Sequence, residues 1–471
     1  MDKYSKLLSN TFIFAIGTLS SKVLVFLLMP LYTRVLTSAD YGVVDLIVQT
    51  SNLLIPIVSV GISNAVIRFG LDKSIRKSEV FSTGLLTVIC GFSIFLLMIP
   101  LVGKVRYINE HTVLIYIYVL TSSLRGLCSQ FTKSRGLVRL YAFDGVLSTI
   151  TIIIFNLLFL LVFKLGIVGY ILATILSDFL SVVFLFASSG LHRFIHFKHI
   201  KKSTIKAMLS YSIPLIPATV FWWVTNVSDR YIVSYMLGSE ANGLYAISYK
   251  IPTIIILISG IFIDAWQIAA VSETDKRSRE RFFSKVFGVY QALIFVTASG
   301  LIAFCKVITK ILVSDAFYAS WEYIPFLVMS TVFSCFVTFL GTVYMVEKKS
   351  SLTLITTVLG AIINVVMNIW LIPLYGVNGA AFATFFSYFM VFVVRAINTK
   401  KFLKIDFKPV ALIFNLAVLT AQSLIIIDSD ANWIYYQAGL VVVMLIFNHK
   451  RLLMAAKKLL GKYLPSKGAK A

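Results

Sequence analysis

Long apolar runs recur along almost the whole chain, and they constrain its fold more than any other feature. A helix needs about 20 apolar residues to cross a lipid bilayer. Charged residues make up only 13% of this chain, against about a quarter in soluble domains. We therefore predict an all-α, polytopic membrane protein with fourteen spans. Their approximate limits are 7–32, 42–68, 80–102, 112–132, 142–164, 167–190, 208–237, 243–270, 283–304, 321–346, 352–373, 379–397, 409–427 and 433–448.

Lys and Arg are unevenly divided between the two sets of connecting segments, which predicts an orientation. With a cytoplasmic N-terminus, the cytoplasmic segments hold 32 Lys and Arg, the opposite loops hold 6, and five lie inside spans. This excess is typical of the cytoplasmic side. We expect a cytoplasmic (inner) membrane protein with both termini inside and the first run retained as a span. The net charge of +23 then faces the anionic lipids of the inner leaflet and predicts no nucleic-acid partner.

Two short motifs recur in the same order. The turn 36–42, Leu-Thr-Ser-Ala-Asp-Tyr-Gly, has a counterpart 201 residues later in 237–243, Leu-Gly-Ser-Glu-Ala-Asn-Gly. The turn 166–169, Gly-Ile-Val-Gly, has a counterpart 210 residues later in 376–379, and both are followed shortly by Ala-Thr. Each pair lies six predicted spans apart, so the copies share one orientation. This predicts a parallel repeat.

The repeat predicts three regions. Residues 1–206 form an N-terminal six-helix lobe, and residues 207–400 form a C-terminal six-helix lobe. Residues 401–471 hold two appended transmembrane helices, which have no counterpart, and a basic cytoplasmic tail.

Cations inside the predicted spans are the main candidates for a binding site. Ionisable groups at this depth are costly, and they usually face a bundle interior or a wet cavity. Lys22 and Arg125 come from the first lobe, and Arg230 and Lys250 from the second. If they meet between the lobes, they form a positive site suited to a phosphate or pyrophosphate. Asn226, in the same span as Arg230, is a further substrate-binding candidate, with interhelical hydrogen bonding as its alternative.

Carboxylates inside or near the spans offer a different interpretation of these cations. Each Lys or Arg could pair with an acid, and Asp229, Asp178 and Asp45 lie at suitable depth. Asp144 and Asp264 lie nearer the cytoplasmic ends. Asp178, in the middle of the sixth span, could also titrate and couple transport to protons or sodium. Both interpretations stay open at this point.

Enzyme, cofactor and metal sites are not indicated. A Walker A pattern is absent, and no outer loop is long enough to form a catalytic domain. The four cysteines lie in or beside apolar runs without a C-x-x-C pair, which is typical of buried hydrophobic residues. His192, His196 and His199 have helical spacing for a metal site. Their basic and aromatic surroundings instead favour a segment that lies on anionic lipid.

Four segments carry a family resemblance that covers essentially the whole chain. They are Pro30-Leu-Tyr-Thr-Arg34 with Ala39-Asp-Tyr-Gly42, Asn226-x-x-Asp229-Arg230, Gly243-Leu-Tyr245 with Tyr249-Lys250, and Leu374-Tyr-Gly376-Val-Asn378-Gly379-Ala380-Ala381. Their order and spacing resemble the polysaccharide-exporter branch of the multidrug/oligosaccharidyl-lipid/polysaccharide superfamily, in particular the Wzx-type flippases. The resemblance implies a MATE-like fold, alternating access and a cationic central cavity. It also implies a lipid-linked oligosaccharide, carried on undecaprenyl pyrophosphate, that is turned from the inner to the outer leaflet.

We therefore predict a flippase for a repeat unit of a surface polysaccharide, such as capsule or O-antigen. The expected partners are the lipid-linked substrate, anionic membrane lipids and a polysaccharide polymerase. One alternative is a multidrug/cation antiporter of MATE-like architecture, whose cavity should be acidic or apolar. A second alternative is a membrane polysaccharide polymerase, which calls for a large outer loop with catalytic residues.

Overall fold

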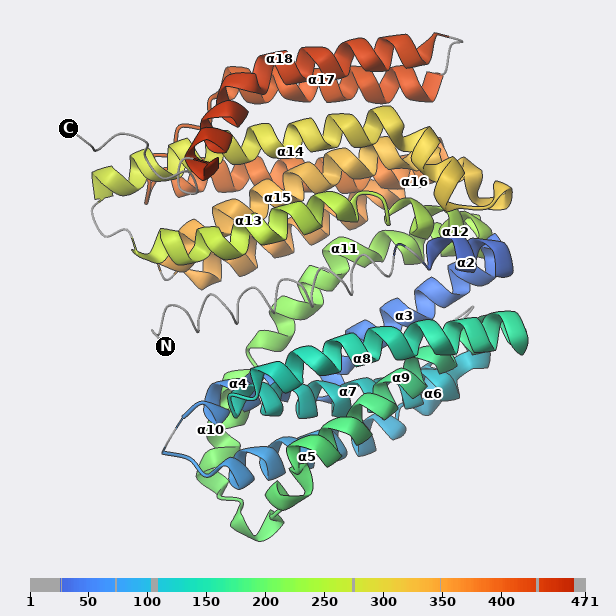
Figure 1. Cartoon of the computed structure of the whole chain (residues 1–471), viewed down its shortest axis with the longest axis vertical. Coiled ribbons are helices and arrows are strands. Elements are labelled where there is room, and N and C mark those ends of the chain that lie inside the picture. The colour runs from blue at the N-terminus through green and yellow to red at the C-terminus, as the bar shows by residue number, and fades with distance from the viewer. Residues whose placement is uncertain are drawn as a thin grey trace, which may run out of the picture. The chain divides into compact units, whose positions relative to one another are not determined.

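The chain is seen here as a computed structural model in which every regular element of the described part is a helix (Figure 1). The described residues are 26, 28–72, 74–102, 109–272, 276–347, 349–428 and 432–460. Most of the predicted first span, together with Lys22, lies outside them. The predicted all-α class is confirmed.

The chain divides into two compact units, residues 1–246 and 247–471. The helices of the first unit are α2 (Met29–Val35), α3 (Ser38–Val58), α4 (Ile62–Gly70), α5 (Lys77–Leu96), α6 (Ile99–Val102), α7 (Thr112–Ser134), α8 (Val138–Asn156), α9 (Gly166–Ser189), α10 (Lys202–Ser212), α11 (Leu215–Leu237) and most of α12 (Ser239–Ser248). Those of the second are α13 (Thr253–Ser272), α14 (Lys276–Leu312), α15 (Ile324–Val346), α16 (Ser350–Thr399), α17 (Pro409–Asp428) and α18 (Trp433–Leu460). Short 3₁₀ helices occupy Asn109–His111, Leu191–Phe194, Phe197–His199 and Asp315–Tyr323, and a π-helical turn occupies Leu157–Val162.

Ten helices of the described part are long and apolar enough to cross a membrane. The number is up to eleven if α12 and Thr253–Ile263, which are joined by a bend of 43°, form one span. The predicted number was fourteen, and three spans account for the difference. The first lies mostly outside the described residues, the last corresponds to α18, which is not counted, and α16 contains two predicted spans. The protein is a multi-pass membrane protein.

Helix α16 is a pair of helices that turns at a glycine. Its 50 residues would measure about 75 Å as one straight helix, while the hydrocarbon core is about 30 Å thick. Gly376 has φ +58° and ψ −141°, and Pro373 lies just before it. A positive φ is costly for residues with a Cβ, so the glycine allows the reversal that the repeated Gly-x-x-Gly turn predicts. The halves match the predicted spans 352–373 and 379–397.

The second predicted span, 42–68, is also broken. Helix α3 ends at Val58, and the next residues Val60 and Gly61 have φ values of +53° and +59° before α4 begins. Pro56 lies inside the last turn of α3, and a proline weakens the local helical hydrogen bonding. The seventh span, 208–237, is interrupted more mildly between α10 and α11, where Ile213 and Pro214 keep helical backbone angles.

The two units have cores of different character. In the second unit, aromatic side chains of α14, α15 and α16 pack together, and Phe392 meets Phe333 in an edge-on contact and Phe336 in a tilted one. In the first unit, two smaller clusters lie around α7 and combine β-branched, leucine and aromatic residues. Helices α17 and α18 pack along α14 (Figure 1). The lobe boundary predicted at 206 stays a prediction, and we note that α11 packs on α3 within the first unit.

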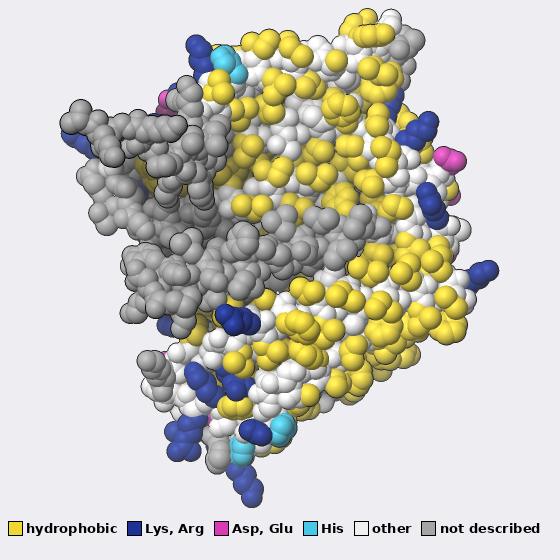
Figure 2. Space-filling model, viewed as in Figure 1, with side chains coloured by type: hydrophobic (Ala, Val, Ile, Leu, Met, Phe, Trp, Pro, Cys, Tyr) yellow, Lys and Arg dark blue, Asp and Glu magenta, His cyan; other side chains and the backbone are white. Residues whose placement is uncertain are grey.

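On the face shown in Figure 2, the helix sides are apolar and the exposed Lys and Arg side chains gather towards the helix ends. Large apolar side chains such as Leu97, Val410 and Ile446 are well exposed. A continuous apolar surface of this extent is unfavourable in water. The described surface therefore fits helices that face lipid.

Candidate functional site

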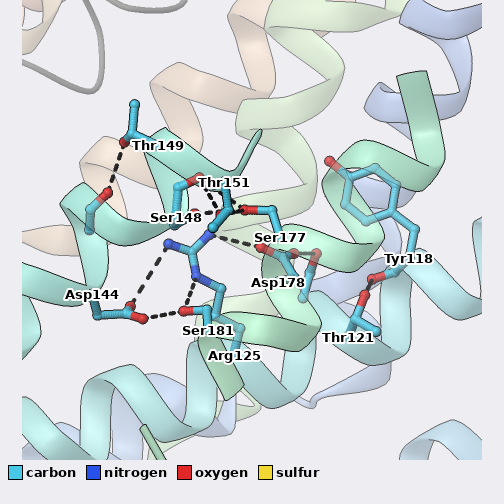
Figure 3. Close-up of polar contacts among 12 residues, drawn as sticks. Tyr118, Thr121, Arg125, Asp144, Ser148, Thr149, Thr151, Ser177, Asp178 and Ser181 are labelled. Carbon is cyan, nitrogen blue, oxygen red and sulfur yellow. Dashed lines mark hydrogen bonds and ion pairs between the residues drawn. The ribbon is translucent and has the colours of Figure 1, made fainter. Parts of the chain in front are cut away.

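Arg125 lies between two buried carboxylates in the first unit (Figure 3). It comes from α7, Asp144 from α8 and Asp178 from α9. Arg125 Nη1 is 2.8 Å from Asp178 Oδ1, and Nη2 is 3.9 Å from Asp144 Oδ2. Arg125 Nε donates to Ser181 Oγ at 3.1 Å. One guanidinium thus joins three helices.

Hydroxyl groups complete the bonding of both carboxylates. Ser122 donates to Asp178 Oδ2, and Ser181 donates to Asp144 Oδ1. Further hydroxyl groups join α8 to α9: Thr151 Oγ1 and Ser177 Oγ lie 2.8 Å apart and share a hydrogen bond. Such bonds are valuable in a medium that offers no water to buried polar groups.

The formal charge of this cluster is −1, because two carboxylates face one guanidinium. The interpretation in which Arg125 pairs with acids agrees with this geometry. The positive site expected from all four cations stays a prediction. Whether Arg125 contacts a substrate stays a prediction. Asp178 forms an ion pair with Arg125, as expected for one of its two predicted roles. The other predicted role of Asp178, coupling of transport to an ion, stays a prediction.

A second polar cluster joins α3 to α11 and α12, also in the first unit. Arg230 Nη1 donates to Asp45 Oδ1, and both side chains are buried. Tyr245 Oη donates to Asp229 Oδ2 at 2.8 Å. The backbone N–H of Arg230 donates to Asp229 Oδ1 at 2.9 Å. Here too, one arginine lies beside two carboxylates.

The contacts continue along the same two helices. Trp223 Nε1 donates to the carbonyl of Gln49 at 3.0 Å, and Gln49 Nε2 lies 3.4 Å from Asp45 Oδ1. The Tyr231 hydroxyl is 2.5 Å from Thr50 Oγ1. We call this set of contacts between α3 and α11–α12 the α3–α11 seam, with Asp45, Gln49 and Thr50 on one side and Trp223, Arg230, Tyr231 and Asn242 on the other.

Local sequence determines where the helices of the seam begin and end. Thr37 and Asp40 form a capping box that starts α3, with Asp40 N donating to Thr37 Oγ1 at 3.1 Å. Gly238, with φ +95°, ends α11 and lets the chain reverse into α12. Asn242 then donates from Nδ2 to the carbonyl of Gly42 at 2.9 Å.

The remaining predicted site residues are distributed as follows. Asn226 Nδ2 donates to the carbonyl of Trp222, one turn earlier in its own helix, at 2.7 Å. Lys250 follows α12 and belongs to the second unit. Lys22 and the side chain of Asp264 lie outside the described residues. A common site of the four cations therefore stays a prediction.

A family model for "Polysaccharide biosynthesis protein" matches residues 7–271, which is more than half of the chain. This chain belongs to that family. The match covers both polar clusters and three of the four motif segments, and it confirms the family resemblance. No curated protein matches the sequence.

Solved structures of two transporter groups share the fold. "Lipid II flippase MurJ, inward closed conformation" aligns with a TM-score of 0.67 and 15% identity, over 96% of this chain and 100% of that one. A multidrug resistance MATE family transporter of the MOP superfamily aligns in its inward-facing conformation with a TM-score of 0.66 and 13% identity, over 82% of this chain and 98% of that one. Its outward-facing conformation gives 0.57 and 13%, over 83% and 92%. This member of the polysaccharide biosynthesis family therefore has the fold of a MOP-superfamily transporter.

Sequence reasoning missed one buried cation of this family member. Arg395, on the second half of α16, was counted with the cytoplasmic charges but is only 4% exposed. Its Nε donates to Thr356 Oγ1 at 3.0 Å, and Nη1 donates to the carbonyl of Val337 at 2.8 Å. Nη2 lies 3.4 Å from the carbonyl of Thr353. Its place two residues inside the predicted span was the available signal.

Two asparagines on the first half of α16 form a polar contact with the second half. Asn364 Nδ2 donates to Thr384 Oγ1 at 3.2 Å, and Asn368 Nδ2 donates to Asn364 Oδ1 at 3.0 Å. All three side chains are buried. Thr384 belongs to the second repeated motif, so this motif supports the packing of the hairpin.

Proposed function

We propose that this protein is a flippase that moves an oligosaccharide repeat unit, linked to undecaprenyl pyrophosphate, from the inner to the outer leaflet. The repeat unit serves the synthesis of a surface polysaccharide such as capsule or O-antigen. The match of residues 7–271 to the polysaccharide biosynthesis family carries this proposal. The fold shared with a structure described as a lipid II flippase supports it, because the alignment spans nearly the whole chain.

The physical task is to carry a charged, hydrated head group across hydrocarbon. Burying an ionised group without a partner costs many kcal/mol, so the head group needs a wet cleft while its lipid tail stays in the bilayer. Alternating access opens such a cleft to one side at a time. No covalent step is needed, and the protein acts as a transporter and not as an enzyme.

The pyrophosphate would bind to cations within the spans. Lys250 and Lys22 remain proposed ligands. Arg125 and Arg230 each hold a carboxylate, so an anionic head group must compete with an aspartate for either guanidinium. Both bonds are charge-assisted, and a pyrophosphate carries more negative charge than a single carboxylate, so it can compete for the guanidinium.

The setting of the protein follows from the charge distribution. We place it in the cytoplasmic membrane with both termini inside, where the excess of Lys and Arg meets anionic lipid. A polysaccharide polymerase on the outer side would use the translocated units.

One observation favours a second candidate, a multidrug antiporter. Both polar clusters of the first unit carry two carboxylates for one arginine. A surplus of negative charge suits cationic drugs, and MATE transporters share the fold. The family match still favours the flippase.

Deletion of the gene separates the candidates. Loss of a flippase leaves lipid-linked repeat units in the inner leaflet, where an impermeant sugar oxidant cannot reach them in intact cells. Loss of a polymerase leaves single units outside, where the oxidant destroys them. Loss of an antiporter raises drug susceptibility and leaves these lipids unchanged, and this outcome would contradict the proposal.

A further inference from the structure

The two copies of the first repeated motif lie against each other in the structure. A Cβ added to Gly42 would overlap the carbonyl oxygen of Ser239 and lie 2.9 Å from the backbone nitrogen of Gly243. A Cβ added to Gly243 would overlap the carbonyl oxygen of Ser38 and lie 2.7 Å from that carbonyl carbon. The contact is reciprocal, since each glycine meets the serine four residues before the other. The two copies of the motif therefore contact each other around a local pseudo-two-fold axis.

The α3–α11 seam continues directly from this crossing. Asn242 binds the carbonyl of Gly42, and Asp45 binds Arg230 about one turn further along α3. Another turn along, the carbonyl of Gln49 accepts a hydrogen bond from Trp223 Nε1, and the hydroxyl groups of Thr50 and Tyr231 share a hydrogen bond. Residues three or four apart share one face of a helix. One stripe of α3 is thus joined by polar bonds from its second turn to beyond its middle.

These contacts are of a kind that can separate. Polar bonds between membrane helices are worth only about 0.6–2 kcal/mol each, and water that enters between the helices can replace them. An ion pair also regains hydration when it opens. The seam starts at the end of α3 that the Lys and Arg distribution places outside.

We propose that the α3–α11 seam is the outer closure of the transport path, and that Arg230 acts in this closure by pairing with Asp45. The inference rests on the proposed flippase function and changes the role of Arg230 within it. If Arg230 were a substrate ligand, it would bind the pyrophosphate directly. In the closure, it is a positioning residue that joins α11 to α3, and the pair breaks when the path opens outward.

Exchange of the two charges tests this role. Asp45→Arg and Arg230→Asp each place like charges together, and each should lower the flipping rate by about tenfold or more. The double variant Asp45→Arg with Arg230→Asp restores an ion pair and should recover flipping to within about threefold of the parent. A double variant as inactive as Arg230→Asp alone would overturn the proposal, because a pyrophosphate ligand cannot be exchanged for an acid.

A labelling experiment reads the closure without any substrate. Thr50→Cys, in a background lacking the exposed Cys90, lies at the inner end of the seam. An impermeant thiol reagent added outside should label it slowly in the parent, several-fold faster in either single charge variant, and slowly again in the double variant. Equal labelling in all four would overturn the closure. If the parent moves no lipid-linked sugar but shows this labelling pattern, the proposed function fails and the closure stands.

Discussion

Gly42→Ala should weaken the contact between α3 and α12. The added Cβ would lie 2.9 Å from the backbone nitrogen of Gly243 and would overlap the Ser239 carbonyl oxygen. Ordinary contact begins near 3.4 Å. Clearing the nitrogen alone therefore requires the two backbones to separate by about half an ångström, and clearing the carbonyl oxygen requires more. Both neighbours are main-chain atoms and cannot turn aside. Such overpacking costs about 1–3 kcal/mol.

This cost falls on the closed arrangement, so it changes the closing equilibrium by about 5- to 150-fold. We expect Gly42→Ala to raise outside labelling of Thr50→Cys and to lower the flipping rate. Gly243→Ala should act in the same way, because the crossing is reciprocal. The double variant should not add the two effects, since both alter one contact.

Gly145→Ala is the matched control. Gly145 lies on α8 of the same unit, and a Cβ there would meet nothing within 4 Å. Alanine is the better helix former by about 1 kcal/mol, so this variant should flip normally and unfold at an equal or higher temperature. The labelling rates and the flipping rates are measured for all variants in membranes. If Gly42→Ala and Gly145→Ala behave alike, the close crossing has no role.

Further predictions concern two other arginines, Arg125 and Arg395. Asp178→Asn removes the carboxylate 2.8 Å from Arg125 and should destabilise the detergent-solubilised protein by about 1.5–3 kcal/mol. Asp144→Asn removes a partner at 3.9 Å and should cost less; the reverse order of melting temperatures would contradict the geometry. Arg395→Lys should destabilise more than Arg395→Met, by about 2 kcal/mol. An ammonium cannot reach the carbonyl of Val337 and the hydroxyl of Thr356 together. A more stable Lys variant would refute this account of the guanidinium.

The helices were predictable because the bilayer sets their length. Runs of about 20 apolar residues have few alternatives in lipid, and the turn at Gly376 was visible in the repeated Gly-x-x-Gly. The break between α3 and α4 was not predicted, since Val60 adopts a positive φ that its residue type does not suggest. That break depends on tertiary packing.

The ion pairs were only partly predictable. The sequence supplied the acids, but Asp45 and Arg230 are 185 positions apart, and no local pattern pairs them. The repeat indicated two related turns without indicating that Gly42 and Gly243 touch. Arg395 was assigned to the cytoplasm because it lies near a span end, and only its packing against α15 reveals that it is buried.

Reconstitution tests the central claim most directly. Lipid-linked oligosaccharide isolated from a strain that lacks this protein is placed in liposomes with the purified chain, and its exposure to an impermeant sugar oxidant is followed over time. We expect the fraction of oxidised lipid to rise from the outer-leaflet share towards completion, at a rate proportional to the amount of protein. Oxidation that stops at the outer-leaflet share, as in protein-free liposomes, would contradict the flippase.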